Sequence, residues 1–236
     1  AFLVLADALY RSANLEHAAA SLPNMLAGTV LVILLSTLLL TATLPAVTVF
    51  GVHPASVLLF VLYAGGVRVT ASGRRRPMWS PAKTADTRED VADADSRGTG
   101  VVQLLGTVLV CSVVVAVAGF FIARSGIAIA AATGLREGVV GVLATALVTS
   151  MPELITTVAA VRHGALTLAV GGILGGNTFD VLFVALADVA YRDGSIYHQI
   201  TPELQFSILL CITMTATLLL GLLRRERRGP GNVGWE

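Results

Sequence analysis

Long apolar runs separated by short polar segments dominate this chain. Their lengths, roughly 17–25 residues for most of them, are those of helices that cross a bilayer. Residues 1–10 are predicted to end a preceding span, and a polar stretch over residues 68–100 interrupts the pattern. The runs predict six further spans over about residues 25–46, 54–67, 101–123, 138–161, 166–190 and 204–223.

Composition agrees with this pattern. Of the 236 residues 55% are hydrophobic and only 13% are charged, and the mean hydropathy is +0.80. A soluble domain of this length would carry far more charge. The predicted fold class is therefore an all-α polytopic membrane protein that contacts the lipid bilayer. The net charge of +1 gives no indication of a nucleic-acid partner.

The basic residues predict an orientation. If residues 68–100 are cytoplasmic and the spans are threaded outward from them, thirteen of the sixteen basic residues lie inside, including the group from Arg224 to Arg228. Basic residues accumulate on the cytoplasmic side of membrane proteins. We therefore expect an integral protein of the cell membrane, with residues 68–100 and Arg224–Arg228 in the cytoplasm.

An internal repeat suggests two inverted halves. Residues 2–11 and 183–192 share Phe, Leu, Ala, Asp, Tyr and Arg at matching positions, at an offset of 181. Five predicted spans separate the copies, so the copies point in opposite directions, as in many secondary transporters. We expect residues 1–67 to end an N-terminal half, 68–100 to form a loop, and 101–236 to form a C-terminal half. The repeat also predicts a fragment, with spans missing at both ends.

Each copy of the repeat holds an acid four residues before an arginine. These pairs are Asp7 with Arg11 and Asp188 with Arg192. On a helix, residues at this spacing lie on one face and form ion pairs. We therefore assign both acids a structural role as interfacial ion pairs.

Two other acids within apolar runs are the candidate residues of a functional site. Glu153 and Asp180 lie near no basic residue in their spans, and ionisable groups at membrane depth are costly and mark ion pathways. Ala146, Thr149 and Glu153 fall on one helical stripe, and Gly172, Gly176 and Asp180 fall on another. Pro152 has no N–H, so nearby carbonyls can turn inward. We predict two broken helices that cross at their glycines, with both acids pointing into one polar gap.

Two motifs carry a family resemblance: Thr149-Ser150-Met151-Pro152-Glu153 and Gly175-Gly176-Asn177-Thr178-Phe179-Asp180. They resemble the second α-repeat, here residues 138–190, of the sodium/calcium exchanger or calcium/cation antiporter superfamily. The resemblance implies ten spans in two inverted halves of five, with a diamond of ligands where the repeats meet. The sequence shows no nucleophile–base pair and no metal-ligand spacing, so we expect no enzymatic activity and no cofactor, and no protein partner is evident.

The resemblance also implies a role for each motif residue. Glu153 would be the central carboxylate shared by calcium and sodium, and Asp180 would hold the second acidic position. Thr149 would give a carbonyl and a hydroxyl, and Ala146 a carbonyl. Asn177 would lie beside Asp180 and support a helix break. The remaining residues would support the break or the helix packing: Ser150, Pro152, Gly172, Gly175 and Gly176.

Three positions depart from the family pattern. Val148 stands where the family has glycine, Gly172 where it has asparagine, and Gly176 where it has serine. A hydroxyl expected at one sodium site is therefore absent. The resemblance implies exchange of calcium for sodium, with proton coupling or potassium dependence as alternatives. A membrane scaffold that keeps the fold without transport is the alternative from a different class.

Overall fold

In the part of the chain that the computed structural model describes, all the long elements are helices. Five of these helices are long and apolar enough to cross a membrane, which confirms an all-α polytopic membrane protein. The structure describes residues 19–75, 100–134 and 146–224.

The chain forms two compact units, each described by itself. The first, called here the bundle unit, is Ala1–Arg88 with Thr156–Glu236, and the second unit is Glu89–Ile155. In its described part, the bundle unit contains four long helices and a short 3₁₀ helix: α3 (Leu22–Thr43), α4 (Pro54–Arg75), α9 (Leu166–Ala190), η3 (Ile196–Gln199) and α10 (Pro202–Arg224). The end of α8 (Met151–Arg162) also belongs to it, because the boundary between the units falls within that helix.

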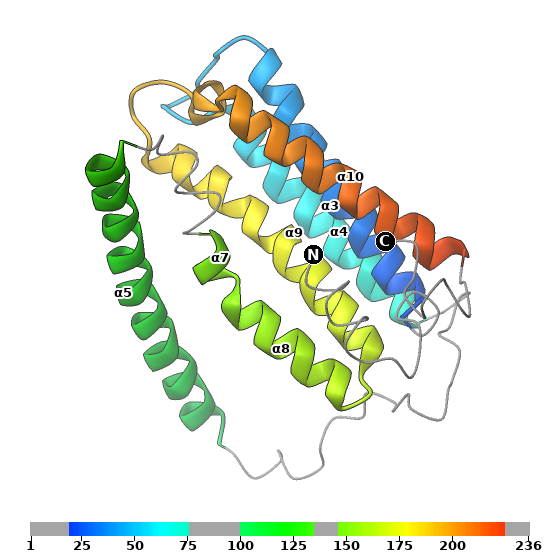
Figure 1. Ribbon diagram of the computed structural model, residues 1–236. Coiled ribbons are helices and arrows are strands. Elements are labelled where there is room, and N and C mark those ends of the chain that lie inside the picture. The colour runs from blue at the N-terminus through cyan, green and yellow to red at the C-terminus, as the bar shows by residue number, and fades with distance from the viewer. Residues whose placement is uncertain (1–18, 76–99, 135–145, 225–236) are drawn as a thin grey trace. The chain divides into compact units, whose positions relative to one another are not determined.

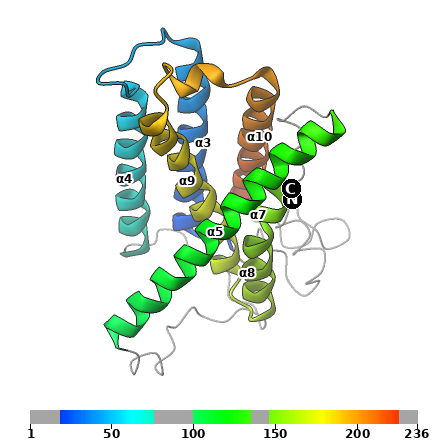
Figure 2. The ribbon, with the colours of Figure 1, turned by 90° about the vertical axis from the view of Figure 1, so that its left-hand side faces the viewer.

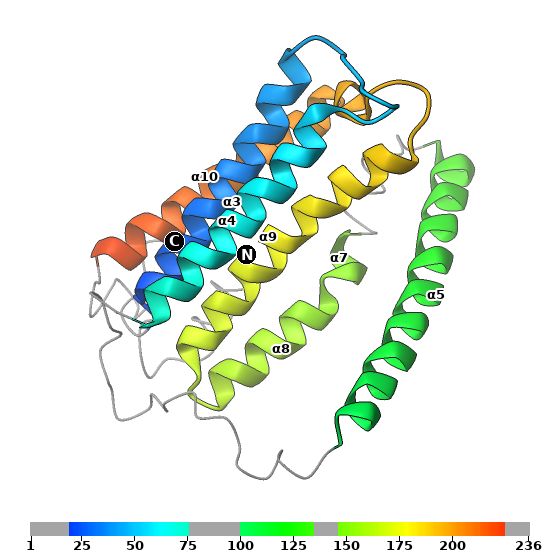
Figure 3. The same ribbon diagram turned by 180° about the vertical axis from the view of Figure 1, so that it is seen from behind.

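Helix α3 is the centre of the bundle unit. It packs against α4, α9 and α10, and α9 also packs against α4 (Figure 1). The view in Figure 2 shows α3 between α4 and α10. Residues 44–53 connect α3 to α4 and residues 191–201 connect α9 to α10, and both connections lie at the same end of the bundle (Figure 3). This end is called the loop end below.

The core of the bundle unit is a stripe of leucines on α3. Leu31, Leu34 and Leu38 recur at the spacing of one helical face and are buried against Leu174 of α9 and Leu222 of α10, among others. Many other apolar side chains of these helices are exposed. A helix that is apolar all round fits this arrangement in a bilayer, where lipid covers the outward faces.

The start and end of α3 follow local chemistry. The helix covers Leu22–Thr43, three residues earlier than the predicted 25–46. Ser21 caps the start, because its hydroxyl accepts the backbone N–H of Asn24 at 3.3 Å. The end comes before Leu44 because Pro45 follows, and a residue before proline disfavours the helical conformation.

Two other helices exceed their predicted lengths. Helix α4 continues to Arg75, through residues that the sequence assigned to the loop. In the second unit, α5 (Val101–Thr133) has 33 residues where the pattern predicted 101–123. At a rise of about 1.5 Å per residue it is about 50 Å long. The hydrocarbon core is only about 30 Å thick, so α5 must tilt or project from it.

Close helix packing in the bundle unit depends on glycine at a few positions. A Cβ at Gly66 of α4 would lie 2.5 Å from a methyl group of Val30 on α3, and a Cβ at Gly28 would lie 2.8 Å from Leu219 on α10. These glycines let α4 and α10 approach α3 closely.

Candidate functional site

The predicted break around Pro152 is present. Helix α7 covers Ala146–Thr149, Ser150 forms a turn, and α8 covers Met151–Arg162. Pro152 is the second residue of α8, a position at which its missing N–H costs little. The N–H of Leu154 donates to the Ser150 carbonyl at 3.1 Å and closes the first turn. Pro152 thus lies at the start of a new helix. Because proline has no N–H, the Val148 carbonyl lacks the helical hydrogen bond that residue 152 would otherwise donate.

Glu153 lies in the first turn of α8. Its side chain and that of Thr149 are exposed, and Ser150 is partly buried. The start of a helix is the positive end of its dipole, so an acidic side chain suits this position. The break therefore places the acid, a hydroxyl and irregular backbone carbonyls within a few residues, which is the chemistry of a site for a hard cation.

The second predicted broken helix is continuous. Helix α9 runs from Leu166 to Ala190 without interruption through Gly172–Asp180. The expected break beside Asn177 is therefore wrong. Glycine weakens a helix by only about 1 kcal/mol and keeps its N–H, and the segment contains no proline. Packing of the buried face of α9 against α3 and α4 is enough to keep these turns helical.

The predicted stripe on α9 lies on a largely exposed face. Gly172 and Asp180 are exposed and Gly176 is partly buried. Asn177 is also exposed, whereas Leu174, Thr178 and Val181 are buried. Asp180 therefore lies on a face of α9 different from the one that packs against α3 and α4.

The motif glycines do not serve packing in the way of Gly28 and Gly66. Among the residues that the structure describes, nothing lies within 4 Å of a Cβ placed at Gly172, Gly175 or Gly176. By contrast, a Cβ at neighbouring Gly171 would lie 2.8 Å from the side-chain oxygen of Asn24 on α3. The close approach of residues 138–161 to 166–190 at these glycines stays a prediction.

The two acids lie in different units of the chain. Glu153 belongs to the second unit and Asp180 to the bundle unit. Their meeting in one polar gap, together with Thr149, Ala146 and Asn177, stays a prediction.

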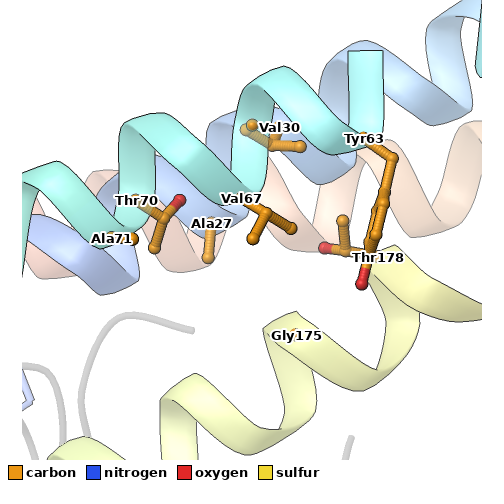
Figure 4. Close-up of a pocket in the computed structure, with 9 residues that line it drawn as sticks. Ala27, Val30, Tyr63, Val67, Thr70, Ala71, Gly175 and Thr178 are labelled. Carbon is orange, nitrogen blue, oxygen red and sulfur yellow. The ribbon is translucent and has the colours of Figure 1, made fainter. Parts of the chain in front are cut away.

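A cavity between α3, α4 and α9 borders the motif. Its volume is about 230 Å³, and Figure 4 shows Tyr63 of α4 and Thr178 of α9 pointing into it. Gly175 lies on its wall, and none of the nine lining residues is charged. An uncharged, mostly apolar wall cannot replace the hydration shell of a metal cation, so this cavity does not serve as the cation site.

Sequence reasoning missed a buried polar cluster at the loop end. At its centre is Asp188, near the end of α9, with a side chain that is 0% exposed. Its Oδ2 atom accepts the backbone N–H of His53 and the hydroxyl of Ser56, both at 2.7 Å. Its Oδ1 atom accepts the backbone N–H of Ile196 at 3.3 Å. The carboxyl group thus joins α9 to the start of α4 and to η3. These residues and Tyr197 are called the Asp188 cluster below.

Tyr197 completes the Asp188 cluster. Its hydroxyl lies 2.7 Å from the hydroxyl of Ser56. Because Ser56 already donates to Asp188, Tyr197 is the donor to Ser56. Burial, together with the nearby Asp188 carboxyl group, raises the pKa of Tyr197 to about 12. The tyrosine hydroxyl therefore stays protonated and able to donate at physiological pH.

The expected ion pair between Asp188 and Arg192 is wrong. Helix α9 ends at Ala190, so Arg192 is beyond the helix and the spacing of four residues no longer places it beside Asp188. Arg192 is exposed, and its guanidinium approaches Gly51, where a Cβ would lie 2.8 Å from Nη1. Gly51 also has a φ of +79°, which favours glycine. The other expected pair, Asp7 with Arg11, lies outside the described residues.

One signal in the sequence could have identified the cluster. The repeat aligns Asp188 with Asp7 and His198 with His17. Recurrence of the acid and the histidine at the same spacing indicates a role for Asp188 beyond a surface ion pair. Two of the three partners of Asp188, His53 and Ser56, however, lie more than a hundred positions away. No spacing rule connects segments so distant.

Comparison with known proteins identifies the family. The profile described as "Sodium/calcium exchanger protein" matches residues 103–235, which is more than half of the chain. The chain belongs to the sodium/calcium exchanger protein family. Both motifs of this exchanger-family chain, around Glu153 and around Asp180, lie in the matched segment, whereas His53 and Ser56 lie before it.

Two relatives in the curated set support the assignment. The chain is 33% identical over 85 residues to "Inner membrane protein YrbG" of Escherichia coli (strain K12). This alignment covers 36% of this chain and 26% of that protein. The chain is 31% identical over 110 residues to "Sodium/calcium exchanger MaX1" of Methanosarcina acetivorans. This alignment covers 44% of this chain and 31% of that protein. The matches thus span about a third or less of each relative. No solved structure gives a significant match.

Proposed function

We propose that the protein to which this chain belongs is a secondary antiporter that exchanges calcium for sodium across a cell membrane. The observation that carries this proposal is Glu153, an acid in the first turn of α8, three residues after the helix break at Ser150 and inside the segment matched by the exchanger family. Calcium favours carboxylate and carbonyl oxygens, and a helix break brings both together.

In this proposal Glu153 and Asp180 are the acidic ligands. Thr149 adds a hydroxyl and a carbonyl, Ala146 adds a carbonyl, and Asn177 lies one turn before Asp180 on α9. The exposure of Asp180 on a side of α9 that does not pack against α3 and α4 supports this assignment. Calcium and sodium would compete for the same oxygens, and two faces of the site would open alternately.

The proposal includes an arrangement in the membrane. Residues 1–67 would end the first exchanger half and residues 101–236 would belong to the second. Residues 68–100 and Arg224–Arg228 would face the cytoplasm, as the distribution of basic residues favours. The loop end of the bundle unit would then face the opposite side.

Proton coupling is the second candidate. Gly176 provides no hydroxyl at the position where the family has serine, which weakens one sodium site. Carboxyl groups such as Glu153 and Asp180 can release calcium to a proton instead of a sodium ion. The same site would then exchange calcium for protons.

Calcium uptake by the full-length protein in sealed vesicles tests the proposal. Uptake should follow an outward sodium gradient, and dissipation of the proton gradient should leave it unchanged. Uptake that follows only the proton gradient would select calcium/proton exchange, and a dependence on added potassium would select a potassium-dependent exchanger.

Uptake that responds to neither sodium nor proton gradients would contradict antiport and favour the scaffold alternative. Glu153→Gln is the matched variant, because the amide keeps the size of the side chain and removes its charge. This variant should lose uptake while it inserts normally.

A further inference from the structure

We propose that Asp188 is a positioning residue for the cation site. By tying the end of α9 to α4 and η3, it sets the rotation of α9 and therefore the direction in which Asp180 points. This inference rests on the calcium exchange proposed above. Asp188 itself is buried and touches no transported ion in this account.

The geometry of α9 links the two acids. Asp180 and Asp188 are eight residues apart on one continuous helix. At 3.6 residues per turn they differ by about 80° around the axis and by about 12 Å along it. A helix of this length rotates as a rigid body, so fixing the direction of Asp188 also fixes the direction of Asp180.

Two sets of hydrogen bonds join the buried face of α9 to α3 and to the start of α4, one at each end of the helix. At the beginning, Asn24 of α3 donates from Nδ2 to the Thr167 carbonyl at 3.2 Å and to the Ala19 carbonyl at 3.0 Å. At the far end, Asp188 accepts from His53 and Ser56. Because hydrogen bonds are directional, these contacts define one rotation of the helix.

Between the two ends the contacts are mainly apolar. Leu174, Val181, Leu182 and Ala185 are buried there, and apolar contacts have no preferred direction. Thr178 is polar and buried, but its hydroxyl donates to the Leu174 carbonyl of its own helix. Tyr63 of α4 and Phe179 of α9 also meet edge to face there, with ring centroids 6.2 Å apart. The hydrogen bonds at the two ends therefore act together with this packing to set the rotation of the middle of α9, which carries Asn177 and Asp180.

The donors around Asp188 require a carboxyl group. Two of them are backbone N–H groups, of His53 and Ile196, and the third is the Ser56 hydroxyl. A carboxylate accepts at both oxygens, whereas an asparagine amide accepts at one and presents N–H groups at the other. Asp188→Asn should therefore keep part of the cluster, and Asp188→Ala should leave buried N–H groups without acceptors.

The test measures the calcium concentration for half-maximal uptake, together with the maximal rate, in the full-length protein. We expect Asp188→Ala to raise the half-maximal concentration roughly tenfold, the low end of the effect of groups that orient metal ligands, and Asp188→Asn to raise it less. Leu218→Ala is the matched control, because it weakens the buried contact of α10 with α3 and leaves the ends of α9 intact. It should lower the amount of folded protein without changing the half-maximal concentration.

If Asp188→Ala does not fold, Ser56→Ala replaces it. That variant removes one of the three donors and should shift the half-maximal concentration in the same direction by a smaller factor. The inference is overturned if the parent protein exchanges calcium and the folded Asp188 and Ser56 variants keep its half-maximal concentration. A parent protein that neither takes up nor binds calcium would overturn the proposed exchange itself, and this inference with it.

Discussion

Asp180 and Asp188 lie on the same helix, yet their surroundings are opposite. Asp188 is fully buried and accepts three hydrogen bonds from residues of the bundle unit, whereas Asp180 is exposed on a different face of α9. An acid whose acceptor atoms are satisfied by the protein's own donors serves structure. Asp180 is exposed within an apolar span, and we propose that it contacts a transported cation. The difference teaches that burial and donors, more than position within an apolar run, decide the role of an intramembrane acid.

The largest expected effect of this difference is on stability. Asp188→Ala should lower the free energy of unfolding by about 3 kcal/mol, because it leaves buried donors unsatisfied. Asp180→Ala should change it by no more than about 0.5 kcal/mol, as usual at exposed positions. Denaturation of the purified protein in detergent measures both. Equal costs for the two variants would remove the distinction between the acids.

The second effect is on transport. Asp180→Asn should reduce calcium uptake by about tenfold or more, because it removes an acidic ligand. Its thermal unfolding temperature without calcium should match that of the parent. Uptake at the parent rate would show that Asp180 is not a ligand.

Two neighbouring glycines on α9 give a finer comparison. Gly171→Ala should destabilise the protein by about 1 kcal/mol, because the new Cβ displaces Asn24 and weakens its hydrogen bond to Thr167. Gly172→Ala should be neutral or stabilising by up to about 1 kcal/mol, because it improves helix propensity. Unfolding measurements separate the two variants.

Uptake by the Gly172→Ala variant then tests the predicted helix crossing. If uptake falls while stability does not, the close approach of residues 138–161 to α9 at Gly172 is supported. If uptake is unchanged, the crossing does not require glycine at this position.

The smallest effect concerns Tyr197. Tyr197→Phe removes the donor to Ser56 and should cost about 1 kcal/mol at neutral pH. Burial holds the pKa of Tyr197 near 12, against 10.0 for a free tyrosine, so its contribution to stability is present below about pH 10. That contribution is lost as the pH rises toward about 12, because the unfolded chain ionises first.

Stability of the parent and of Tyr197→Phe across this pH range measures the contribution. The difference between them should shrink as the pH rises. Tyr63→Phe, outside the Asp188 cluster, is the control. A difference that stays constant with pH would contradict the assignment of the raised pKa to Tyr197.

Much of the fold could be predicted because it depends on local patterns. Apolar runs located the five long helices, and Pro152 located the break between α7 and α8. The end of α3 was misplaced because Pro45 overrides an apolar pattern that continues past it. The expected break in α9 failed because glycines permit a bend but do not remove backbone hydrogen bonds, as proline does.

The site was harder to predict from sequence. The motifs around Glu153 and Asp180 identify the acids, but the meeting of the two depends on long-range geometry. The Asp188 cluster was missed for the same reason, since His53 and Ser56 approach Asp188 only when α4 packs against α9. Spacing along one helix suggested Arg192 instead, and only the end of α9 at Ala190 excludes that pairing.

The most direct test of the central claim is a calcium-binding isotherm of the full-length protein. It should be measured for the parent, Glu153→Gln, Asp180→Asn and the double variant. If the two acids share one calcium ion, each single change should weaken binding by about tenfold or more, and the double variant should bind much as the weaker single variant does. Independent, additive losses, or parent affinity in either single variant, would contradict a shared site.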